Sequence, residues 1–364
     1  MPEQGRKIKL IIAVPSLECG GLERNVSMIC NHINTEKFEV TLLVVNNSKP
    51  FYSITNPAIK ITDLQCSNVR SSVFRISKIA KEIKPDIILS AANHLNLIIA
   101  IFRWMFPRHI KMIARESSIV SINSKRAKNA GLYNWLQEKF YHKIDKVVCQ
   151  SAYMQQDLLA YYHFPLSRTV IINNAVEVPA VDLSHSVKDK SAIPVFITVA
   201  RLSEEKGLDR IIRSLAKLNR PFQYHITGEG PMRPQLQSLI NELNLQDKVS
   251  LAGSSSNPYS TIKNPDLFLM GSHYEGFPNV LLEANALGIP VVTFNAPGGI
   301  AEVIRDEENG LLVEDGNEQA FADAIEKALL IDFNREGIRN KTIERYAPGK
   351  IIQQWESLLM AEIH

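Results

Sequence analysis

The chain has 364 residues, of which 45% are hydrophobic and 22% are charged, and its net charge is +3 at pH 7. This length and composition are typical of a soluble globular protein with two domains of ordinary size, and the small net charge gives no reason to expect a nucleic-acid partner. The four cysteines show neither metal-ligand nor disulfide spacing. We therefore expect reduced thiols in a cytoplasmic protein, and we predict no metal site.

The sequence contains no recognisable targeting or membrane-spanning segment. The apolar run Leu10–Val14 is too short for the core of a signal peptide, and no cleavage site follows it. No uncharged apolar run approaches the roughly 20 residues that a membrane span requires. We therefore expect a protein that is not secreted through this segment and does not cross a membrane.

The first half of the chain alternates between strand and helix patterns. The first predicted strand, residues 8–14, leads into a loop that contains Gly20 and Gly21 and opens into a helix. Glycines there let the backbone approach a ligand at the edge where open α/β sheets bind ligands, although a tight turn is the alternative explanation. Further strands are predicted at 38–45, 59–64, 86–90, 110–115, 146–150 and 168–173, and helices at 71–84, 95–106, 135–142 and 152–162.

Two stretches of this half are candidates for contacts with other molecules. The basic and aromatic residues of 103–111 could rest on an anionic membrane surface, which would be a peripheral contact. The alternative is that the aromatic side chains pack in the core and the charges face water. Residues 114–131 are rich in small and basic residues, which favours a mobile loop over a cleft.

A polar segment at 179–194 is predicted to be a linker, because the alternating pattern restarts after it. Strands are then predicted at 195–200, 222–227, 249–252, 266–270, 291–294 and 310–313, and helices at 208–218, 233–243, 278–288, 318–330 and 349–363. Two such halves predict two doubly wound parallel sheets. The predicted domains are residues 1–178 and 195–345, followed by a C-terminal helix within 346–364.

Residues 265–294 carry the densest functional pattern. A strand leads into a loop that contains Glu275, and the following helix carries Glu283 four residues after Asn279, so that these two side chains share one face. The N–H groups near Asn279 and Val280 at the helix start can bind a phosphate, and the carboxylates can accept hydrogen bonds from sugar hydroxyls. The pattern therefore suits a nucleotide-sugar. The alternative is that both glutamates merely favour a helix N-terminus and a solvated face.

Two cations follow the first strand of the second half. Arg201 ends this strand, and Lys206 lies just before the next helix. Together they could hold a diphosphate, with bidentate geometry from the arginine and a compact point charge from the lysine; the alternative is a pair of ordinary surface charges. Gly228 lies in another strand-end turn, where it either forms the turn or contacts the ligand.

These motifs together resemble the retaining GT-B glycosyltransferases of family four, also called group 1. "SHYEGFPNVLLEANALGIPVV" resembles the E-x7-E motif of that family, and "ARLSEEKG" resembles its G-R-L-x-x-x-K-G motif, with Ala200 where glycine is common. "GGLER" and "ITGEGP" resemble two more of its glycine-containing segments. The resemblance covers almost the whole chain. It implies an α/β fold with two Rossmann-like domains facing a central cleft, an N-terminal acceptor-binding domain and a C-terminal nucleotide-sugar-binding domain. The last helix would cross back to the first domain.

The resemblance also implies roles for individual residues. Arg201 and Lys206 would neutralise the leaving diphosphate, Glu275 would contact hydroxyls of the donor sugar, and Glu283 would contact the ribose. Many relatives carry a histidine near Glu116, at the end of "IARESS", so Glu116 is the candidate for contacting the acceptor or donor sugar. The predicted catalytic residues are Arg201, Lys206, Glu275 and Glu116. The residues expected to contact the nucleotide-sugar are Gly20, Gly21, Arg201, Lys206, Gly228, Glu275, Gly276, Phe277, Asn279, Val280, Leu281 and Glu283.

The implied activity is metal-independent transfer of a hexose or N-acetylhexosamine from a nucleoside-diphosphate sugar, with a UDP-sugar favoured and configuration retained. The acceptor would be a glycan or a polyprenyl-diphosphate-linked sugar at the cytoplasmic face of the inner membrane, in surface polysaccharide or glycoconjugate synthesis. No further cofactor is expected, and no Asp-x-Asp motif is present to hold a metal. Two alternatives remain: a non-transferase GT-B enzyme such as a UDP-sugar epimerase, and a catalytically inactive partner subunit that binds nucleotide-sugar.

Overall fold

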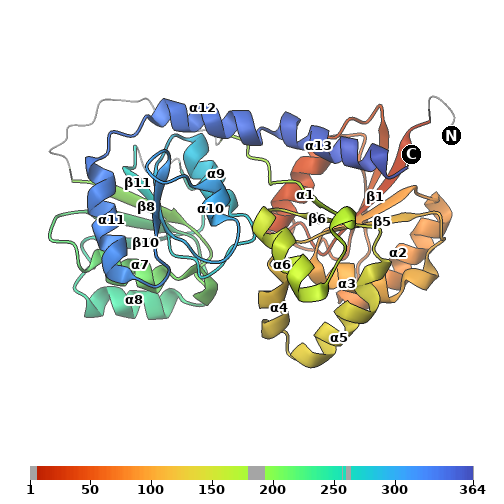
Figure 1. Ribbon diagram of the computed structural model, residues 1–364, viewed down its shortest axis with the longest axis horizontal. Helices are drawn as coiled ribbons and strands as arrows, with labels where there is room; N and C mark the ends of the chain where they lie inside the picture. The colour runs from red at the N-terminus through yellow and green to blue at the C-terminus, as the bar shows by residue number, and fades with distance from the viewer. Residues whose placement is uncertain (1–5, 179–192, 256, 260–263, 364) are drawn as a thin grey trace. The chain divides into compact units, whose positions relative to one another are not determined.

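The computed structural model describes residues 6–178, 193–255, 257–259 and 264–363 (Figure 1). The chain forms two compact units, each built around its own parallel sheet. The first unit contains the chain up to Ala175 together with the residues from Pro348 onward, and the second unit runs from Val176 to Ala347. Most of the predicted linker, residues 179–192, lies outside the described residues.

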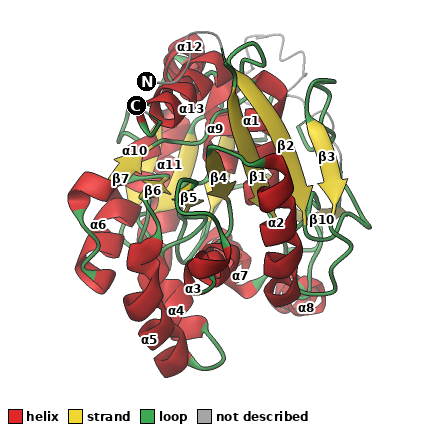
Figure 2. Cartoon of the chain, turned by 90° about the vertical axis from the view of Figure 1, so that its right-hand side faces the viewer, coloured by secondary structure: helices red, strands yellow, loops and turns green. Residues whose placement is uncertain are grey.

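The first unit contains a seven-stranded sheet with the order β3-β2-β1-β4-β5-β6-β7, in which all neighbouring strands are parallel. Its strands are β1 (Ile8–Val14), β2 (Phe38–Val44), β3 (Lys60–Asp63), β4 (Ile87–Ser90), β5 (Lys111–Arg115), β6 (Lys146–Cys149) and β7 (Thr169–Ile171). Its helices are α1 (Gly21–His32), α2 (Val69–Ile83), α3 (Asn93–Ile101), α4 (Val120–Arg126), α5 (Ala130–Phe140), α6 (Ala152–Tyr162) and α13 (Pro348–Ala361). Figure 2 shows these elements from the side.

Helices cover both faces of this sheet. Side chains 10–14 of β1 alternate between the two faces and are all buried, as in a strand inside a parallel sheet. On one face, β1 packs with α1 and with Ile351, Ile352 and Trp355 of α13. Helix α3 packs against both α2 and α5. The strand order reverses between β1 and β4, so the loops after these strands form the edge where such sheets bind ligands.

The second unit contains a six-stranded parallel sheet with the order β10-β9-β8-β11-β12-β13. Its strands are β8 (Val195–Val199), β9 (Gln223–Thr227), β10 (Val249–Gly253), β11 (Leu267–Met270), β12 (Val291–Phe294) and β13 (Gly310–Val313). Its helices are α7 (Leu208–Leu215), α8 (Arg233–Glu242), α9 (Asn279–Ala286), α10 (Ile300–Val303), α11 (Glu318–Leu330) and α12 (Arg335–Tyr346). The strand order reverses between β8 and β11, and the loops that follow these strands contain Arg201 and Glu275.

The predicted strands are confirmed with small differences in their bounds, whereas the helices differ more, and α5 begins five residues before its predicted start at 135. Helices α4, α10 and α12 were not predicted, and α4 makes the predicted mobile loop at 114–131 partly wrong. The helix predicted at 95–106 ends at Ile101 and is followed by the 3-10 turn Arg103–Met105. Pro107 comes soon after this turn, and its ring cannot continue a helix.

Among the residues that the structure describes, no helix is both long enough and apolar enough to cross a membrane.

Candidate functional site

Two loops of the second unit are joined at the carboxyl edge of its sheet. One loop, residues 200–207, follows β8, and the other, residues 271–278, follows β11. The His273 N–H donates to the Glu205 carbonyl oxygen at 2.9 Å. Gly207 has a φ of +52°, and a Cβ on it would lie 2.1 Å from the Gly271 carbonyl oxygen. Glycine is therefore required directly after Lys206, both for the left-handed backbone and for the close packing of the loops.

Lys206 and Glu275 form an ion pair across these two loops. The Lys206 Nζ atom lies 2.7 Å from Glu275 Oε1, and the same oxygen accepts a hydrogen bond from the Ser272 hydroxyl at 2.7 Å. Burial alone would lower the pKa of Lys206, but the neighbouring Glu275 carboxylate raises it. The structure thus brings together two predicted site residues that lie 69 positions apart, and it adds Ser272 to them.

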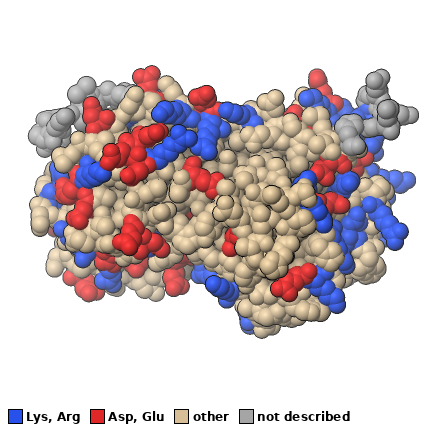
Figure 3. Space-filling view, viewed as in Figure 1, with Lys and Arg blue, Asp and Glu red and all other residues tan. Residues whose placement is uncertain are grey.

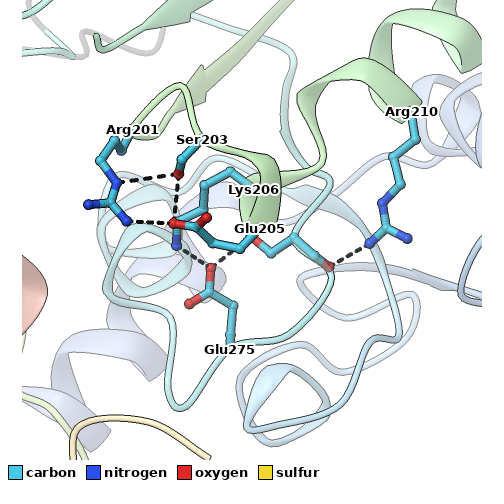
Figure 4. Close-up of polar contacts among 7 residues, drawn as sticks. Arg201, Ser203, Glu205, Lys206, Arg210 and Glu275 are labelled. Atoms are coloured by element: carbon cyan, nitrogen blue, oxygen red, sulfur yellow. Dashed lines mark hydrogen bonds and ion pairs between the residues drawn. The ribbon is translucent and has the colours of Figure 1, made fainter. Parts of the chain in front are cut away.

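Arg201 is held by two residues of its own loop (Figure 4). Its Nη2 donates to Glu205 Oε1 at 2.6 Å, and its Nε donates to the Ser203 hydroxyl oxygen at 3.3 Å. The Ser203 hydroxyl in turn donates to Glu205 Oε1 at 2.7 Å. Burial acts to raise the pKa of Glu205, but the hydrogen bonds from Ser203 and Arg201 outweigh it and lower the pKa to about 2. Sequence reasoning missed Ser203 and Glu205, although both lie between the two predicted cations.

Arg210 holds the loop after β11 through hydrogen bonds to its backbone. Its side chain is only 8% exposed; Nε donates to the Gly271 carbonyl and Nη2 to the Ser272 carbonyl, each at 2.5 Å. Its Nη1 pairs with Asp315 Oδ1 at 2.7 Å, and the guanidinium lies 4.0 Å from the centroid of the Phe294 ring. One arginine of α7 therefore fixes the backbone that carries Glu275.

Helix α9 begins at Asn279, close to the predicted start. Glu283 on this helix is 6% exposed, and the Tyr259 hydroxyl donates to Glu283 Oε2 at 3.1 Å. The side chains of Phe277 and Leu281 lie in the core, with exposed fractions of 5% and 0%. These two residues can therefore offer a ligand only their backbone groups.

The backbone on both sides of this site is packed too closely for side chains. A Cβ on Gly228, after β9, would lie 1.8 Å from the Ala200 carbonyl oxygen, and one on Gly298, after β12, would lie 1.6 Å from the Glu275 carbonyl oxygen. The Glu275 N–H also donates to the Pro297 carbonyl at 3.0 Å. These contacts give a packing reason for Gly228, while its predicted contact with the nucleotide stays a prediction.

In the first unit, the predicted site residue Glu116 is buried. Its side chain is 1% exposed, and its Oε1 accepts hydrogen bonds from the Tyr141 hydroxyl and from Asn96 Nδ2. Burial raises the pKa of Glu116 to about 8. Its Oε2 is buried without a hydrogen-bond partner among the described residues, and the predicted contact of Glu116 with sugar stays a prediction.

Gly20 and Gly21 lie where they were predicted, at the start of α1. A Cβ on Gly20 would lie 2.2 Å from Glu23 Oε2, so glycine makes room here for the Glu23 carboxyl. Burial raises the pKa of that carboxyl. A role in ligand binding for either glycine stays a prediction.

In the described part of the chain, no group of three His, Cys, Asp or Glu side chains is arranged to hold a metal ion. The charged groups that converge in the second unit are instead two cations and two carboxylates: Arg201, Lys206, Glu205 and Glu275. Guanidinium and ammonium groups bind phosphate, and carboxylates bind hydroxyls.

Two families match the chain, one in each half. Residues 19–178 match the family described as Glycosyltransferase Family 4, and residues 184–345 match the family described as glycosyl transferases group 1. The N-acetylgalactosamine-N,N'-diacetylbacillosaminyl-diphospho-undecaprenol 4-alpha-N-acetylgalactosaminyltransferase of Campylobacter jejuni is 30% identical over 350 residues, which cover 93% of this chain and 94% of that protein.

Solved structures show the same fold. The lipopolysaccharide outer core galactosyltransferase WaaB matches with a TM-score of 0.79 at 22% identity, over 97% of this chain and 99% of that one. HepE of Anabaena in complex with UDP-glucose matches with a TM-score of 0.79 at 19% identity, over 97% of this chain and 100% of that one. With a family match in each half and a relative similar along nearly its whole length, the chain belongs to the group 1 glycosyltransferases and is a glycosyltransferase with the GT-B fold.

Proposed function

We propose that this glycosyltransferase moves a hexose or an N-acetylhexosamine from a nucleoside-diphosphate sugar, with a UDP-sugar favoured, to a glycan or polyprenyl-diphosphate-linked acceptor. The observation that carries the proposal is the convergence of Arg201, Lys206 and Glu275 on two joined loops. These loops lie where the strand order of the sheet reverses, which is the edge where doubly wound sheets bind nucleotides.

In the proposed reaction, the bond between sugar C1 and the β-phosphate oxygen breaks, a bond from C1 to the acceptor oxygen forms, and the proton of the acceptor hydroxyl passes to the departing diphosphate. Negative charge develops on the departing diphosphate. Arg201, Lys206 and the N–H groups at the start of α9 would stabilise this charge. Glu275 would accept hydrogen bonds from donor-sugar hydroxyls, and Glu283 from the ribose. Retention of configuration belongs to the same proposal.

The donor and acceptor classes are supported by the names of similar proteins. The Campylobacter jejuni relative is named for a diphospho-undecaprenol-linked acceptor, and the HepE structure holds UDP-glucose. Because both proteins are similar to this chain along nearly its whole length, we propose that it uses a related donor and a lipid-linked or glycan acceptor. Synthesis of a surface polysaccharide or glycoconjugate is the setting that fits such an acceptor.

The acceptor class leads us to propose a peripheral contact with an anionic membrane, and the first unit offers two surfaces for it. In segment 103–111, Arg103 donates to four carbonyls of residues 106–110, and Phe106 is buried at 3% exposure. Trp104 remains exposed. Part of this cluster therefore serves the fold, while Trp104, Arg108 and His109 are exposed and remain available to lipid.

Helix α5 offers a second surface for this contact. Leu132 and Trp135, three residues apart on α5, are 55% and 51% exposed, and Lys139 Nζ lies 4.6 Å from the Trp135 ring centroid. Residues 120–143 contain five Lys or Arg and one Glu, a net charge of +4. In Figure 3, the area around α4 and α5 is mostly uncharged, with Lys and Arg as well as Asp or Glu atoms at its margins. Exposed aromatic and aliphatic side chains beside cations suit an anionic lipid surface.

Vesicle sedimentation tests this contact. We expect the protein to bind vesicles that contain phosphatidylglycerol more strongly than pure phosphatidylcholine vesicles, and Trp135→Ala to weaken that binding several-fold. Phe51→Ala is the matched control, because Phe51 is also 51% exposed but lies outside the helical segment around α5. Equal binding of wild type and Trp135→Ala would remove the α5 surface from the proposal.

The function itself is tested by incubating the protein with UDP-hexoses or UDP-N-acetylhexosamines and a polyprenyl-diphosphate-linked sugar. The expected result is release of UDP together with a glycosylated lipid, whose new anomeric centre has the configuration of the donor. An epimerase would instead change the donor sugar without needing an acceptor. An inactive subunit would bind the nucleotide-sugar and release nothing.

A further inference from the structure

The guanidinium of Arg201 is already engaged along one whole edge. Its Nη2 donates to Glu205 Oε1 at 2.6 Å, and its Nε donates to Ser203 Oγ at 3.3 Å. These two nitrogens form one of the edges with which an arginine grips a phosphate through two parallel hydrogen bonds. A phosphate that approaches this edge must therefore take the donors away from Glu205 and Ser203 (Figure 4).

Four charged groups of the two loops are paired with one another. Arg201 pairs with Glu205 at 2.6 Å and Lys206 pairs with Glu275 at 2.7 Å, so the four groups sum to zero. A diphosphate would add negative charge to this neutral set. If Glu205 kept its place on Arg201, it would lie beside the phosphates as a like charge, and such a contact is unfavourable.

The two members of the Arg201–Glu205 pair differ in how firmly they are held. The Glu205 side chain is 17% exposed, and its carboxylate also accepts a hydrogen bond from Ser203 Oγ at 2.7 Å. Its backbone carbonyl is fixed by the His273 N–H at 2.9 Å. The Arg201 side chain is 69% exposed. The carboxylate is therefore the anchored partner, and the arginine is the partner that can turn toward a ligand.

We infer that Glu205 is an internal competitor for the diphosphate: it occupies the edge of Arg201 that a phosphate would use and thereby weakens binding of the nucleoside diphosphate. Arg201 exchanges Glu205 for phosphate when the donor binds and returns to Glu205 when the diphosphate product leaves. Glu205 is thus a residue that tunes affinity and product release through Arg201. This inference rests on the proposed function, because it assumes that these loops bind a nucleoside diphosphate.

A different role for the same contact would have the opposite sign. If Glu205 served to hold Arg201 in the right place for phosphate, its removal would weaken binding. If it competes, its removal strengthens binding. The direction of the change in affinity therefore decides between the two roles.

The test measures the affinity for UDP, GDP and ADP by titration calorimetry, and then compares variants with the nucleotide that binds best. Glu205→Gln keeps the size of the side chain and removes its charge. The matched control is Glu204→Gln, which makes the same charge change one residue away on an exposed side chain. The nucleoside without phosphate is the ligand control, because it makes no contact that Arg201 could exchange.

We expect Glu205→Gln to bind the nucleoside diphosphate about three- to fivefold tighter, the range that a partly exposed ion pair can account for. Glu204→Gln should stay within about twofold of wild type, and affinity for the nucleoside should not change. In an Arg201→Ala background the gain from Glu205→Gln should vanish, because no guanidinium remains to be released. Glu205→Ala should change affinity in the same direction, which guards against an effect peculiar to glutamine.

The possible failures can be told apart. Weaker or unchanged binding by Glu205→Gln, with wild type binding a nucleoside diphosphate normally, overturns the competitor role alone. A gain that survives in the Arg201→Ala background also overturns it, since the effect would not pass through Arg201. Wild type that binds none of the three diphosphates overturns the proposed function, and the competitor role falls with it.

Discussion

At the scale of single residues, the pair Lys206–Glu275 is the most constrained part of the candidate site. Glu275 Oε1 accepts from both Lys206 Nζ and Ser272 Oγ, each at 2.7 Å. The carboxylate therefore has a fixed position, and the ammonium is held next to it. Such preorganised charges stabilise a transition state without having to be ordered during the reaction.

The substitution Lys206→Gln tests how much this cation contributes to the rate of sugar transfer. We expect sugar transfer to fall by about 10²- to 10³-fold, because one donor aimed at the developing charge is removed. The measurement is the rate of nucleotide release in the presence of acceptor. Lys341→Gln is the control, since its side chain is 71% exposed and lies on α12. Transfer rates within threefold of wild type would show that Lys206 does not face the leaving group.

The residue Glu116 gives a prediction about pH. Its pKa is raised by burial from 4.5 to about 8, so between these values the folded protein keeps a proton that the unfolded chain has lost. Stability is then highest at low pH within this window and falls as the pH rises toward 8. Glu116→Gln mimics the protonated acid and does not titrate. We expect its Tm, relative to wild type, to rise by several degrees between pH 5 and pH 8 and to level off above.

The control for this comparison is Glu138→Gln, an exposed glutamate of the same unit. Its Tm should follow that of wild type across the pH range. If Glu116→Gln also ran parallel to wild type, the buried carboxyl would not be protonated in the folded protein.

At the scale of elements, the apolar strands were the most predictable part of the chain. Strands β12 and β13 and helices α6 and α11 have the bounds that were predicted, because their apolar patterns and their ends are clear in the sequence. Helix α12 was missed because its twelve residues, REGIRNKTIERY, are mostly polar. The short α4 was missed because its basic and small residues are also typical of a loop.

The candidate site was predictable only in part, for a related reason. The motif resemblance pointed to Arg201, Lys206 and Glu275, but it did not show what holds them. Arg210 donates to the Gly271 carbonyl, 61 positions away, and no local sequence pattern predicts a contact over that distance. Glu116 lay in a recognisable segment, but its burial depends on how helices and strands pack around it.

Arg210 carries the prediction at this scale, because it ties α7 to the loop after β11. Arg210→Met removes the donors of the Gly271 and Ser272 carbonyls, and we expect a loss of roughly 2–4 kcal/mol in the free energy of unfolding. Arg210→Lys should recover little of it, since an ammonium cannot reproduce the planar fork. Chemical denaturation measures the loss, with the exposed Arg213→Met on the same helix as control. A similar small effect of both methionine variants would contradict this role.

At the scale of the whole molecule, the chain forms two units with separate cores, and the last helix belongs to the first of them. Trp355 of α13 is 2% exposed and packs in the first core. We expect calorimetry to resolve two unfolding transitions. Trp355→Ala should lower the Tm of one of them, because it costs the first unit about 3–5 kcal/mol in the free energy of unfolding, as is usual for truncating a buried tryptophan.

The second unit should respond differently in the same experiment. A bound nucleoside diphosphate should raise the Tm of the transition that Trp355→Ala leaves unchanged, because the proposed site lies in the second unit. If the nucleotide and the substitution moved the same transition, either the two units unfold together or the nucleotide site lies elsewhere.

The central claim is that the loops carrying Arg201, Lys206 and Glu275 bind the diphosphate of the donor without a metal. The most direct measurement is the thermal stabilisation of the protein by UDP, GDP, ADP and their sugar conjugates, with and without a divalent metal. A ligand at 100 times its Kd adds about 2.7 kcal/mol, which corresponds to several degrees in Tm. The account predicts that one diphosphate raises Tm without metal and that Arg201→Ala and Glu283→Ala each reduce the rise. No rise with any diphosphate, or a rise that both substitutions leave unchanged, would contradict it.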